Sequence, residues 1–210
     1  MYEIKLTPIQ MALLDVSFTM RGIYFCASQM IDKYAVIGNP ISHSKSPQIH
    51  QMFAAQTGQD ISYERIEAPI ELGEFSLKVS EFIKQGGKGM SVTVPFKLQA
   101  FLDADEKSPR AENALAANTL LFRGGAIFAD NTDGVGLMRD IQLNLGIPLI
   151  NKRVLLLGAG GAAQGVLYPL LEKKPSLLHI ANRTKEKAAV FITTPALANV
   201  IGSTQIQAKG

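Results

Sequence analysis

The sequence predicts an α/β fold made of two successive units. Strand-type and helix-type patterns alternate over residues 33–145, a second unit with a glycine-rich turn begins at residue 153, and Pro148 lies between the two. The chain has 210 residues, of which 47% are hydrophobic and 19% charged. This length and composition are sufficient for two globular domains, each with its own core.

The composition excludes several classes of function. Twenty-one basic and eighteen acidic residues give a net charge of +3, and no run of five basic residues suggests a nucleic-acid partner. Cys26 is the only cysteine, which excludes an internal disulfide, and with three scattered histidines it offers no zinc-binding spacing. We therefore expect a cytoplasmic protein that binds a small anionic ligand and needs no metal.

The first thirty residues contain two apolar stretches, which Asp15 and Arg21 interrupt. Neither stretch approaches the roughly 20 consecutive apolar residues of a membrane span, and the start is too weakly charged for a signal sequence. We expect residues 1–30 to be an N-terminal extension outside the fold, such as a misplaced start site would produce.

The first unit begins with a predicted strand at residues 33–38. This strand ends at a cluster of turn residues at 38–40. Ser46 as N-cap and Pro47 in the first turn predict a helix that Gly58 ends. The apolar face of this helix is expected to include Ile49, Met52, Phe53 and Gln56.

A second strand is predicted at residues 61–67, and a second helix ends at Gly86-Gly87. A third strand is predicted at residues 90–94, and Pro95 begins a helical turn from which Lys97 projects. The buried stripe of the second helix is predicted to be Leu72, Phe75, Val79, Phe82 and Ile83.

A hairpin of residues 119–123 and 126–130 follows, because Gly124-Gly125 permits the positive φ angles of a two-residue turn. A helix over residues 135–145 then ends at Gly146. We place the domain boundary at Pro148, after this linker helix.

The second unit reads as strand, helix and strand: residues 153–157, a helix to about Lys174, and residues 177–181, with a further strand at 203–208. The first strand is a continuous apolar run, which predicts helices on both faces of a parallel sheet. Pro169 lies inside the helix, where it costs about 3 kcal/mol or bends the axis, and the sequence gives no reason for it.

The turn after residue 157 has the dinucleotide-binding pattern, in which glycines permit a tight turn and close approach of the backbone to a pyrophosphate. The helix that follows offers free N–H groups to the phosphates. A glycine-rich turn that serves packing alone is the alternative. The candidate residues are Gly158, Ala159, Gly160, Gly161 and Ala162, in a Rossmann-type unit.

The next strand ends at Asn182, Arg183 and Thr184, where NAD-binding proteins carry an acidic residue for the ribose 2′-hydroxyl. The arginine and its neutral neighbours favour a 2′-phosphate, so we predict NADP, with Lys187 as a further cofactor contact. Alternatively, Arg183 only begins a solvated helix.

Two further groups suggest substrate chemistry. Ser44 and Ser46 present hydroxyls at a helix N-terminus, which suits a ligand carboxylate, although Ser46 by itself reads only as an N-cap. Lys97 follows a strand end, where a lone lysine is usually solvated surface.

Five ordered motifs together resemble the shikimate dehydrogenase family: residues 38–47, 92–97, 118–120, 131–134 and 158–163. The resemblance implies NADPH-dependent reduction of 3-dehydroshikimate to shikimate in chorismate and aromatic amino acid biosynthesis. It implies that the carboxylate is held by Ser44 and Ser46, the ring hydroxyls by Thr93, Asn118 and Asp133, and that Lys97 and Asp133 are the catalytic pair.

The sequence departs from the family pattern at two places. Ser91 stands where the family usually has Asn, so a shorter hydroxyl replaces a substrate-facing amide and weaker substrate binding is expected. The chain ends at Gly210, whereas a complete dinucleotide-binding fold has about six strands. We expect a C-terminally truncated member: a shikimate-binding catalytic domain at 31–147 and a partial NADP-binding Rossmann domain at 148–210.

Three expectations depend on the resemblance alone. Quinate is an alternative substrate, because Ser91 leaves the contacts to the ring hydroxyls open. A non-catalytic module that keeps the substrate pocket is an alternative of another class. A homodimer is a further expectation.

Overall fold

The computed structural model describes residues 31–192 and 205–209, so the expected extension at residues 1–30 lies outside it. Strands and helices alternate in both parts of the chain, which confirms the α/β prediction. The first part consists of β1 (Asp32–Gly38), α2 (Ser46–Thr57), β2 (Ile61–Glu67), α3 (Glu74–Lys84), β3 (Gly87–Val92), α4 (Lys97–Asp103), β4 (Glu106–Lys107), α5 (Pro109–Ala114), β5 (Thr119–Arg123), β6 (Ala126–Asp130), α6 (Asp133–Arg139) and a π-helical turn (Asp140–Asn144). The second consists of β7 (Arg153–Leu157), α7 (Gly161–Glu172), β8 (Leu177–Ala181), α8 (Lys185–Ile192) and β9 (Gln205–Lys209).

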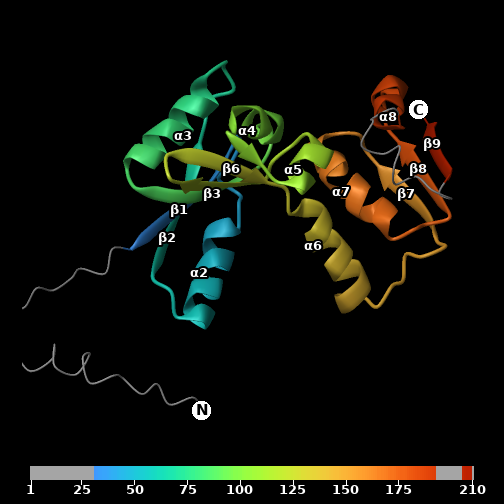
Figure 1. Cartoon of the computed structure of the whole chain (residues 1–210), viewed down its shortest axis with the longest axis horizontal. Coiled ribbons are helices and arrows are strands. Elements are labelled where there is room, and N and C mark those ends of the chain that lie inside the picture. The colour runs from blue at the N-terminus through green and yellow to red at the C-terminus, as the bar shows by residue number, and fades with distance from the viewer. Residues whose placement is uncertain (1–30, 193–204, 210) are drawn as a thin grey trace, which may run out of the picture. The chain divides into compact units, whose positions relative to one another are not determined.

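The first part forms one six-stranded sheet in the order β2-β1-β3-β5-β6-β4. β1 pairs in parallel with β2 and β3, whereas β5 runs antiparallel to both β3 and β6. Helices α3 and α4 cover one face of the sheet and α2 lies on the other (Figure 1). Because β1 and β3 are parallel, the loops that follow them leave the sheet at the same edge.

The second part forms a parallel sheet in the order β7-β8-β9. Helix α7 packs on it through a core that includes Leu167, Leu171 and Ile180. The prediction that both faces of β7 are covered is wrong for the described residues, because Leu155 and Leu157 are 60% and 74% exposed. These side chains alternate with Val154 and Leu156, which pack on the core, so a strand can be apolar throughout and still bury only one face.

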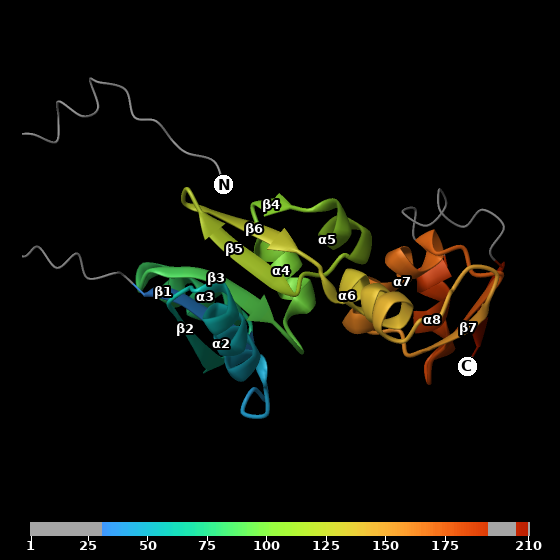
Figure 2. The same ribbon diagram turned by 90° about the horizontal axis from the view of Figure 1, so that it is seen from below.

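The hairpin prediction is confirmed, since Gly124 and Gly125 have φ angles of 59° and 83°. Figure 2 shows β6 leading into α6. The helix begins at Asp133, two residues before its predicted start, and its last turn is π-helical rather than α-helical. The catalytic candidate Asp133 therefore lies in the first turn of a helix rather than in a loop.

Several local predictions in the first part are wrong. The predicted apolar face of α2 is largely exposed, at Ile49, Met52 and Phe53, because this helix buries its small Ala54 instead. Leu72 lies before α3 and is exposed, whereas Phe75, Val79 and Phe82 are buried as predicted.

Two further element boundaries differ from the prediction, and two short elements were not predicted. β3 ends at Val92 rather than at residue 94, and α4 begins at Lys97 rather than at Pro95. β4 and α5 have no predicted counterpart, because two and six residues are too short to show a periodic pattern. Among the described residues, no helix has both the length and the apolar character that a membrane span requires.

Candidate active site

A cavity of about 580 Å³ opens where the loops after β1 and β3 meet β5 and α6. All seven residues that the sequence predicts for the substrate and the chemistry line it. They are Ser44, Ser46, Ser91, Thr93, Lys97, Asn118 and Asp133. Residues spread over about ninety positions are therefore brought to one place by the parallel pairing of β1 with β3 and by the hairpin.

Lys97 and Asp133 form an ion pair in this cavity, with Lys97 Nζ donating to Asp133 Oδ2. Their side chains are only 15% and 25% exposed. Asn118 Nδ2 donates to the other carboxylate oxygen, Oδ1, over 2.8 Å. Each oxygen of the Asp133 carboxylate thus accepts a hydrogen bond, which fixes the orientation of the carboxylate. The carboxylate in turn orients the ammonium group of Lys97.

Backbone hydrogen bonds hold the segments of Lys97 and Asn118 together. Ala117 N donates to the carbonyl of Lys97 over 2.8 Å, and Val92 N donates to the carbonyl of Asn118 over 2.7 Å. The start of α4, the end of β3 and the residues just before β5 are therefore linked by hydrogen bonds.

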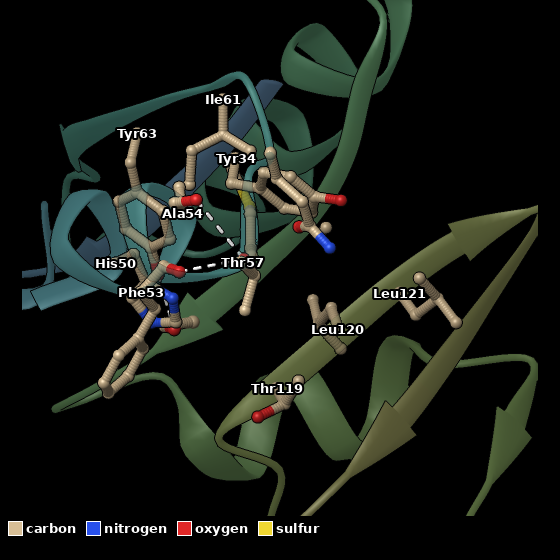
Figure 3. A pocket seen from close by; sticks show the side chains of 14 residues that line it. Tyr34, His50, Phe53, Ala54, Thr57, Ile61, Tyr63, Thr119, Leu120 and Leu121 are labelled. Carbon is tan, nitrogen blue, oxygen red and sulfur yellow. Dashed lines mark hydrogen bonds between the residues drawn. The ribbon is translucent and has the colours of Figure 1, made fainter. Parts of the chain in front are cut away.

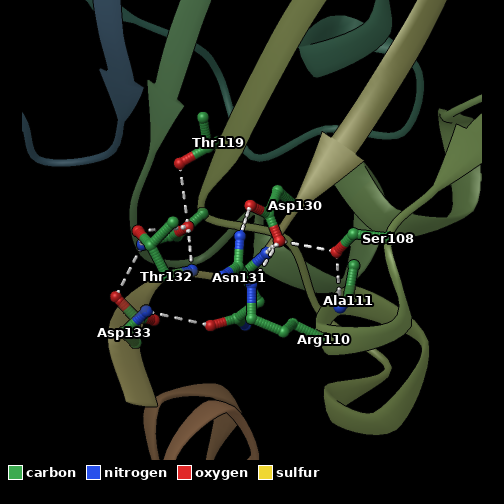
Figure 4. Close-up of polar contacts among 9 residues, drawn as sticks. Ser108, Arg110, Ala111, Thr119, Asp130, Asn131, Thr132 and Asp133 are labelled. Carbon is green, nitrogen blue, oxygen red and sulfur yellow. Dashed lines mark hydrogen bonds and ion pairs between the residues drawn. The ribbon is translucent and has the colours of Figure 1, made fainter. Parts of the chain in front are cut away.

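Asn131, two residues before Asp133, is buried and only 2% exposed. Its Oδ1 accepts from the backbone N–H of Asp133 over 3.1 Å, and its Nδ2 donates to the carbonyl of Ala116 over 3.0 Å. Figure 4 shows the contact of Asn131 with Asp133. The buried amide thus fixes the first turn of α6 to the segment before β5. The sequence motif contains Asn131, but its neighbours give no sign of this role.

A second polar network holds the end of β6, at Asp130 (Figure 4). Arg110 and Ser108 both donate to the carboxylate of Asp130, Ser108 Oγ over 2.5 Å. Burial by itself raises the pKa of the Asp130 carboxyl, but the hydrogen bonds from Arg110 and Ser108 outweigh it and hold that pKa below its ordinary value. Asp130 therefore stays ionised and keeps the end of β6 in place.

The loop before α2 differs from the predicted cap. Lys45, not Ser46, is the N-cap, and the Oγ of Ser44 donates to the Oγ of Ser46 over 3.2 Å. Arg65 donates from Nε and Nη2 to the carbonyl of Ser44, over 3.0 and 2.6 Å. Sequence reasoning missed Arg65, because this contact joins residues 21 positions apart and leaves no local pattern.

Ser91 lines both the first cavity and a second cavity of about 390 Å³, whose lining includes Tyr63 and His50 (Figure 3). Its Oγ is 2.7 Å from the hydroxyl of Tyr63, whose ring stacks on His50 with centroids 4.3 Å apart. Burial raises the pKa of Tyr63 and lowers that of His50, so both rings are neutral near pH 7. Neither ring was predicted, because aromatic residues at these positions read only as core.

The glycine-rich turn lies at the start of α7, where Gly158 has a φ of 105°. A side chain on Gly158 or Gly160 would meet nothing within 4 Å, so the backbone of the turn is open to a ligand. Ala159 and Ala162 belong to the same turn. A Cβ on Gly161 would lie 3.9 Å from the Cβ of Lys97, so the turn lies beside the base of the Lys97 side chain.

The predicted 2′-phosphate residues follow β8. Asn182 Nδ2 donates to the carbonyl of Thr184 over 2.8 Å, which folds this segment into a compact turn. Arg183, Thr184 and Lys187 are exposed. In the part of the chain that the structure describes, no group of three or more His, Cys, Asp or Glu residues could hold a metal ion.

Two family models match the chain. Residues 36–120 match the shikimate dehydrogenase substrate binding domain, and residues 142–206 match shikimate / quinate 5-dehydrogenase. The two matches cover the cavity residues up to Asn118 and the glycine-rich turn, respectively.

Relatives and solved structures are similar over the same region. The chain is 60% identical over 159 residues to the shikimate dehydrogenase (NADP(+)) of Chromobacterium violaceum. The alignment covers 76% of this chain and 58% of that protein. A crystal structure of an Ael1 enzyme from Pseudomonas putida matches with a TM-score of 0.73 and 50% identity, over 84% of this chain and 63% of that one. Shikimate 5-dehydrogenase from Thermus thermophilus, in complex with NADP(H) and shikimate, matches with a TM-score of 0.71 and 32% identity, over 84% and 63%. The chain thus spans less than two thirds of the length of these proteins.

Proposed function

The chain belongs to the shikimate dehydrogenase family, and from this premise we propose that it catalyses the NADPH-dependent reduction of 3-dehydroshikimate to shikimate. The observation that carries the proposal is the Lys97–Asp133–Asn118 network in a cavity that also contains Ser44 and Ser46. The reaction belongs to chorismate and aromatic amino acid biosynthesis.

In this proposal each polar group of the cavity has one role. Ser44 and Ser46 bind the substrate carboxylate, and Thr93, Asn118 and Asp133 bind ring hydroxyls. Lys97 donates a proton to the ketone oxygen, while Asp133 orients the ammonium group. When bound, NADPH supplies the hydride that the carbonyl carbon accepts.

The cofactor role rests on the turn at Gly158, Ala159, Gly160, Gly161 and Ala162. Its open backbone and the N-terminus of α7 suit a pyrophosphate. The exposed Arg183, with Asn182, Thr184 and Lys187, suits a 2′-phosphate, which supports NADP over NAD.

Replacing the candidate proton donor tests the reaction. In the protein expressed from its complete gene, Lys97→Ala should lower kcat by roughly 10² to 10⁴, the usual scale for a general acid. Shikimate binding should change less, because the serines and Asn118 remain. Steady-state assays of NADP⁺ reduction by shikimate measure both, and Lys88→Ala, an exposed lysine of β3, is the control.

The outcomes separate the alternatives. Turnover within twofold of the parent in Lys97→Ala would refute the catalytic role. A parent protein that binds shikimate without turnover would support the non-catalytic module, and a parent that prefers quinate with NAD would support quinate as the substrate. The observation that retains quinate as an alternative substrate is the Ser91–Tyr63 contact, because this contact engages a hydroxyl that lines the cavity.

Cofactor selectivity depends on Arg183. Arg183→Ala should raise the KM for NADP about tenfold or more and leave the KM for NAD nearly unchanged, because only NADP carries the 2′-phosphate. Initial rates with each cofactor provide the measurement. Equal changes for both cofactors would contradict the assignment.

We further place the boundary between a substrate-binding domain at 31–147 and a cofactor-binding domain at 148–210, consistent with the separate sheets. A cytoplasmic location and a homodimer complete the proposal. Cell fractionation and sedimentation of the protein expressed from its complete gene would test both.

A further inference from the structure

Three residues of α7 face the catalytic part of the chain at intervals of four. Gly161 lies next to Lys97, Gly165 next to Asn131 and Gly134, and Pro169 next to Gly134. Residues four apart share one face of a helix, so these three form a single stripe along α7. Both views show α6 beside α7 (Figures 1 and 2).

The contact is closest at Gly134. A Cβ added to this buried glycine would lie 2.3 Å from the carbonyl oxygen of Gly165 and 2.6 Å from Cγ of Pro169. On the other helix, a Cβ on Gly165 would lie 2.8 Å from Oδ1 of Asn131. Neither helix could approach the other so closely with a side chain at these positions.

Pro169 has a clear place in this contact. A proline has no N–H, so Pro169 cannot donate to the carbonyl four residues earlier, which is that of Gly165. This is the same carbonyl that Gly134 approaches, and the proline ring packs on Gly134 beside it. A residue that costs stability inside a helix thus coincides with the point where α7 meets α6.

Helix α6 carries a residue of the proposed substrate site, and α7 carries the proposed cofactor-binding turn. α6 begins with Asp133, which binds Lys97, and α7 begins with the glycine-rich turn. Resting on the proposed function, we propose that Gly134, Gly165 and Pro169 are positioning residues: their contact sets the distance between the Lys97–Asp133 pair and the bound dinucleotide. The substrate carbonyl and the cofactor are thereby held in register for hydride transfer.

The chain offers a matched pair of variants in one helix. In Gly134→Ala the new methyl must displace α7 by about 1 Å, and a misplacement of that size costs about 10² in rate. In Gly136→Ala, at an exposed position of α6, a Cβ meets nothing within 4 Å. In the protein expressed from its complete gene, kcat should fall roughly 10- to 100-fold in Gly134→Ala and stay within twofold in Gly136→Ala.

The KM values for shikimate and NADP should both stay within threefold in Gly134→Ala, because neither binding site is altered. A purely structural role predicts instead a lower Tm with unchanged kcat for the folded fraction. A kcat for Gly134→Ala within twofold of the parent would overturn the proposal.

Pro169→Ala keeps the test decisive if Gly134→Ala does not fold. The substitution removes a helix-breaking residue, so Tm should not fall, whereas kcat should drop at least threefold because the ring contact is lost. Unchanged kcat in this variant would also overturn the proposal. A parent without shikimate-dependent NADP⁺ reduction would instead refute the proposed function and the inference that rests on it, so the two failures are distinguishable.

Discussion

The role expected of Ser91 changes once its neighbours in the structure are known. In the sequence it is a shortened side chain that predicts weaker substrate binding. In the structure its hydroxyl is 2.7 Å from that of Tyr63, at a position that lines both cavities, and Tyr63 is held by stacking on His50. Burial raises the pKa of Tyr63 further above neutral pH, so its hydroxyl stays protonated and can orient that of Ser91 at the wall of the first cavity.

This arrangement predicts that Tyr63 acts through Ser91. Tyr63→Phe keeps the ring but removes the hydroxyl, and should raise the KM for shikimate about fivefold, corresponding to ~1 kcal/mol for one hydrogen bond. Ser91→Ala should have a similar effect, and the double variant little more. The measurement is a double-mutant cycle on KM, with Tyr34→Phe from the same second cavity as the control.

Additive effects of the two substitutions would show that the residues act independently. A fivefold change in Tyr34→Phe as well would point to general loosening of the second cavity.

At the scale of elements, the short helix α5 is fixed to the end of β6 by its N-cap residue, Ser108. The Oγ of Ser108 accepts from Ala111 N over 3.1 Å and donates to Asp130, so one buried hydroxyl joins the helix to the end of β6. Asp130 precedes the segment that carries Asn131 and Asp133. The position of the segment that carries the proposed catalytic residue Asp133 therefore depends in part on a helix of six residues.

Ser108→Ala should lower the free energy of unfolding by about 1–2 kcal/mol, the scale for losing an N-cap. The folded-state pKa of Asp130 is depressed, so its contribution is present at neutral pH and is lost as the pH falls through that lowered pKa. The difference between parent and variant should thus shrink in acid to the part due to the cap. Urea denaturation at neutral and acidic pH measures this, with Ser62→Ala on exposed β2 as the control.

An equal difference at both pH values would mean that the Ser108–Asp130 hydrogen bond contributes nothing. No difference at neutral pH would contradict the capping role as well.

At the scale of the whole molecule, the second sheet exposes an apolar surface. Leu155 and Leu157 lie on one face of β7 and are largely exposed in the described part of the chain. Within that part, β7 pairs only with β8, so one edge of the strand is open. Apolar faces and open edges of this kind favour association.

We therefore predict that the 210-residue chain by itself self-associates at micromolar concentration. Leu155→Lys should shift it toward monomer, because a charge on that face opposes burial. Leu72→Lys, at an exposed leucine outside the second sheet, should not. Size-exclusion chromatography with light scattering measures the effect, and a monomeric parent would contradict the prediction.

Most element types, the hairpin and seven of the residues that line the cavity could be predicted from the sequence, because turn chemistry, periodicity and ordered motifs are each visible within a short stretch of chain. The cap at Lys45, the contact of Arg65 with Ser44 and the stacking of His50 on Tyr63 could not. Nor could a reason for Pro169. These features follow from the tertiary structure, since each depends on which segments the parallel pairing of β1 with β3 and the packing of α6 on α7 bring together. A pattern within one segment carries information about that segment alone, whereas a close approach such as Gly134 to Gly165 exists only between two.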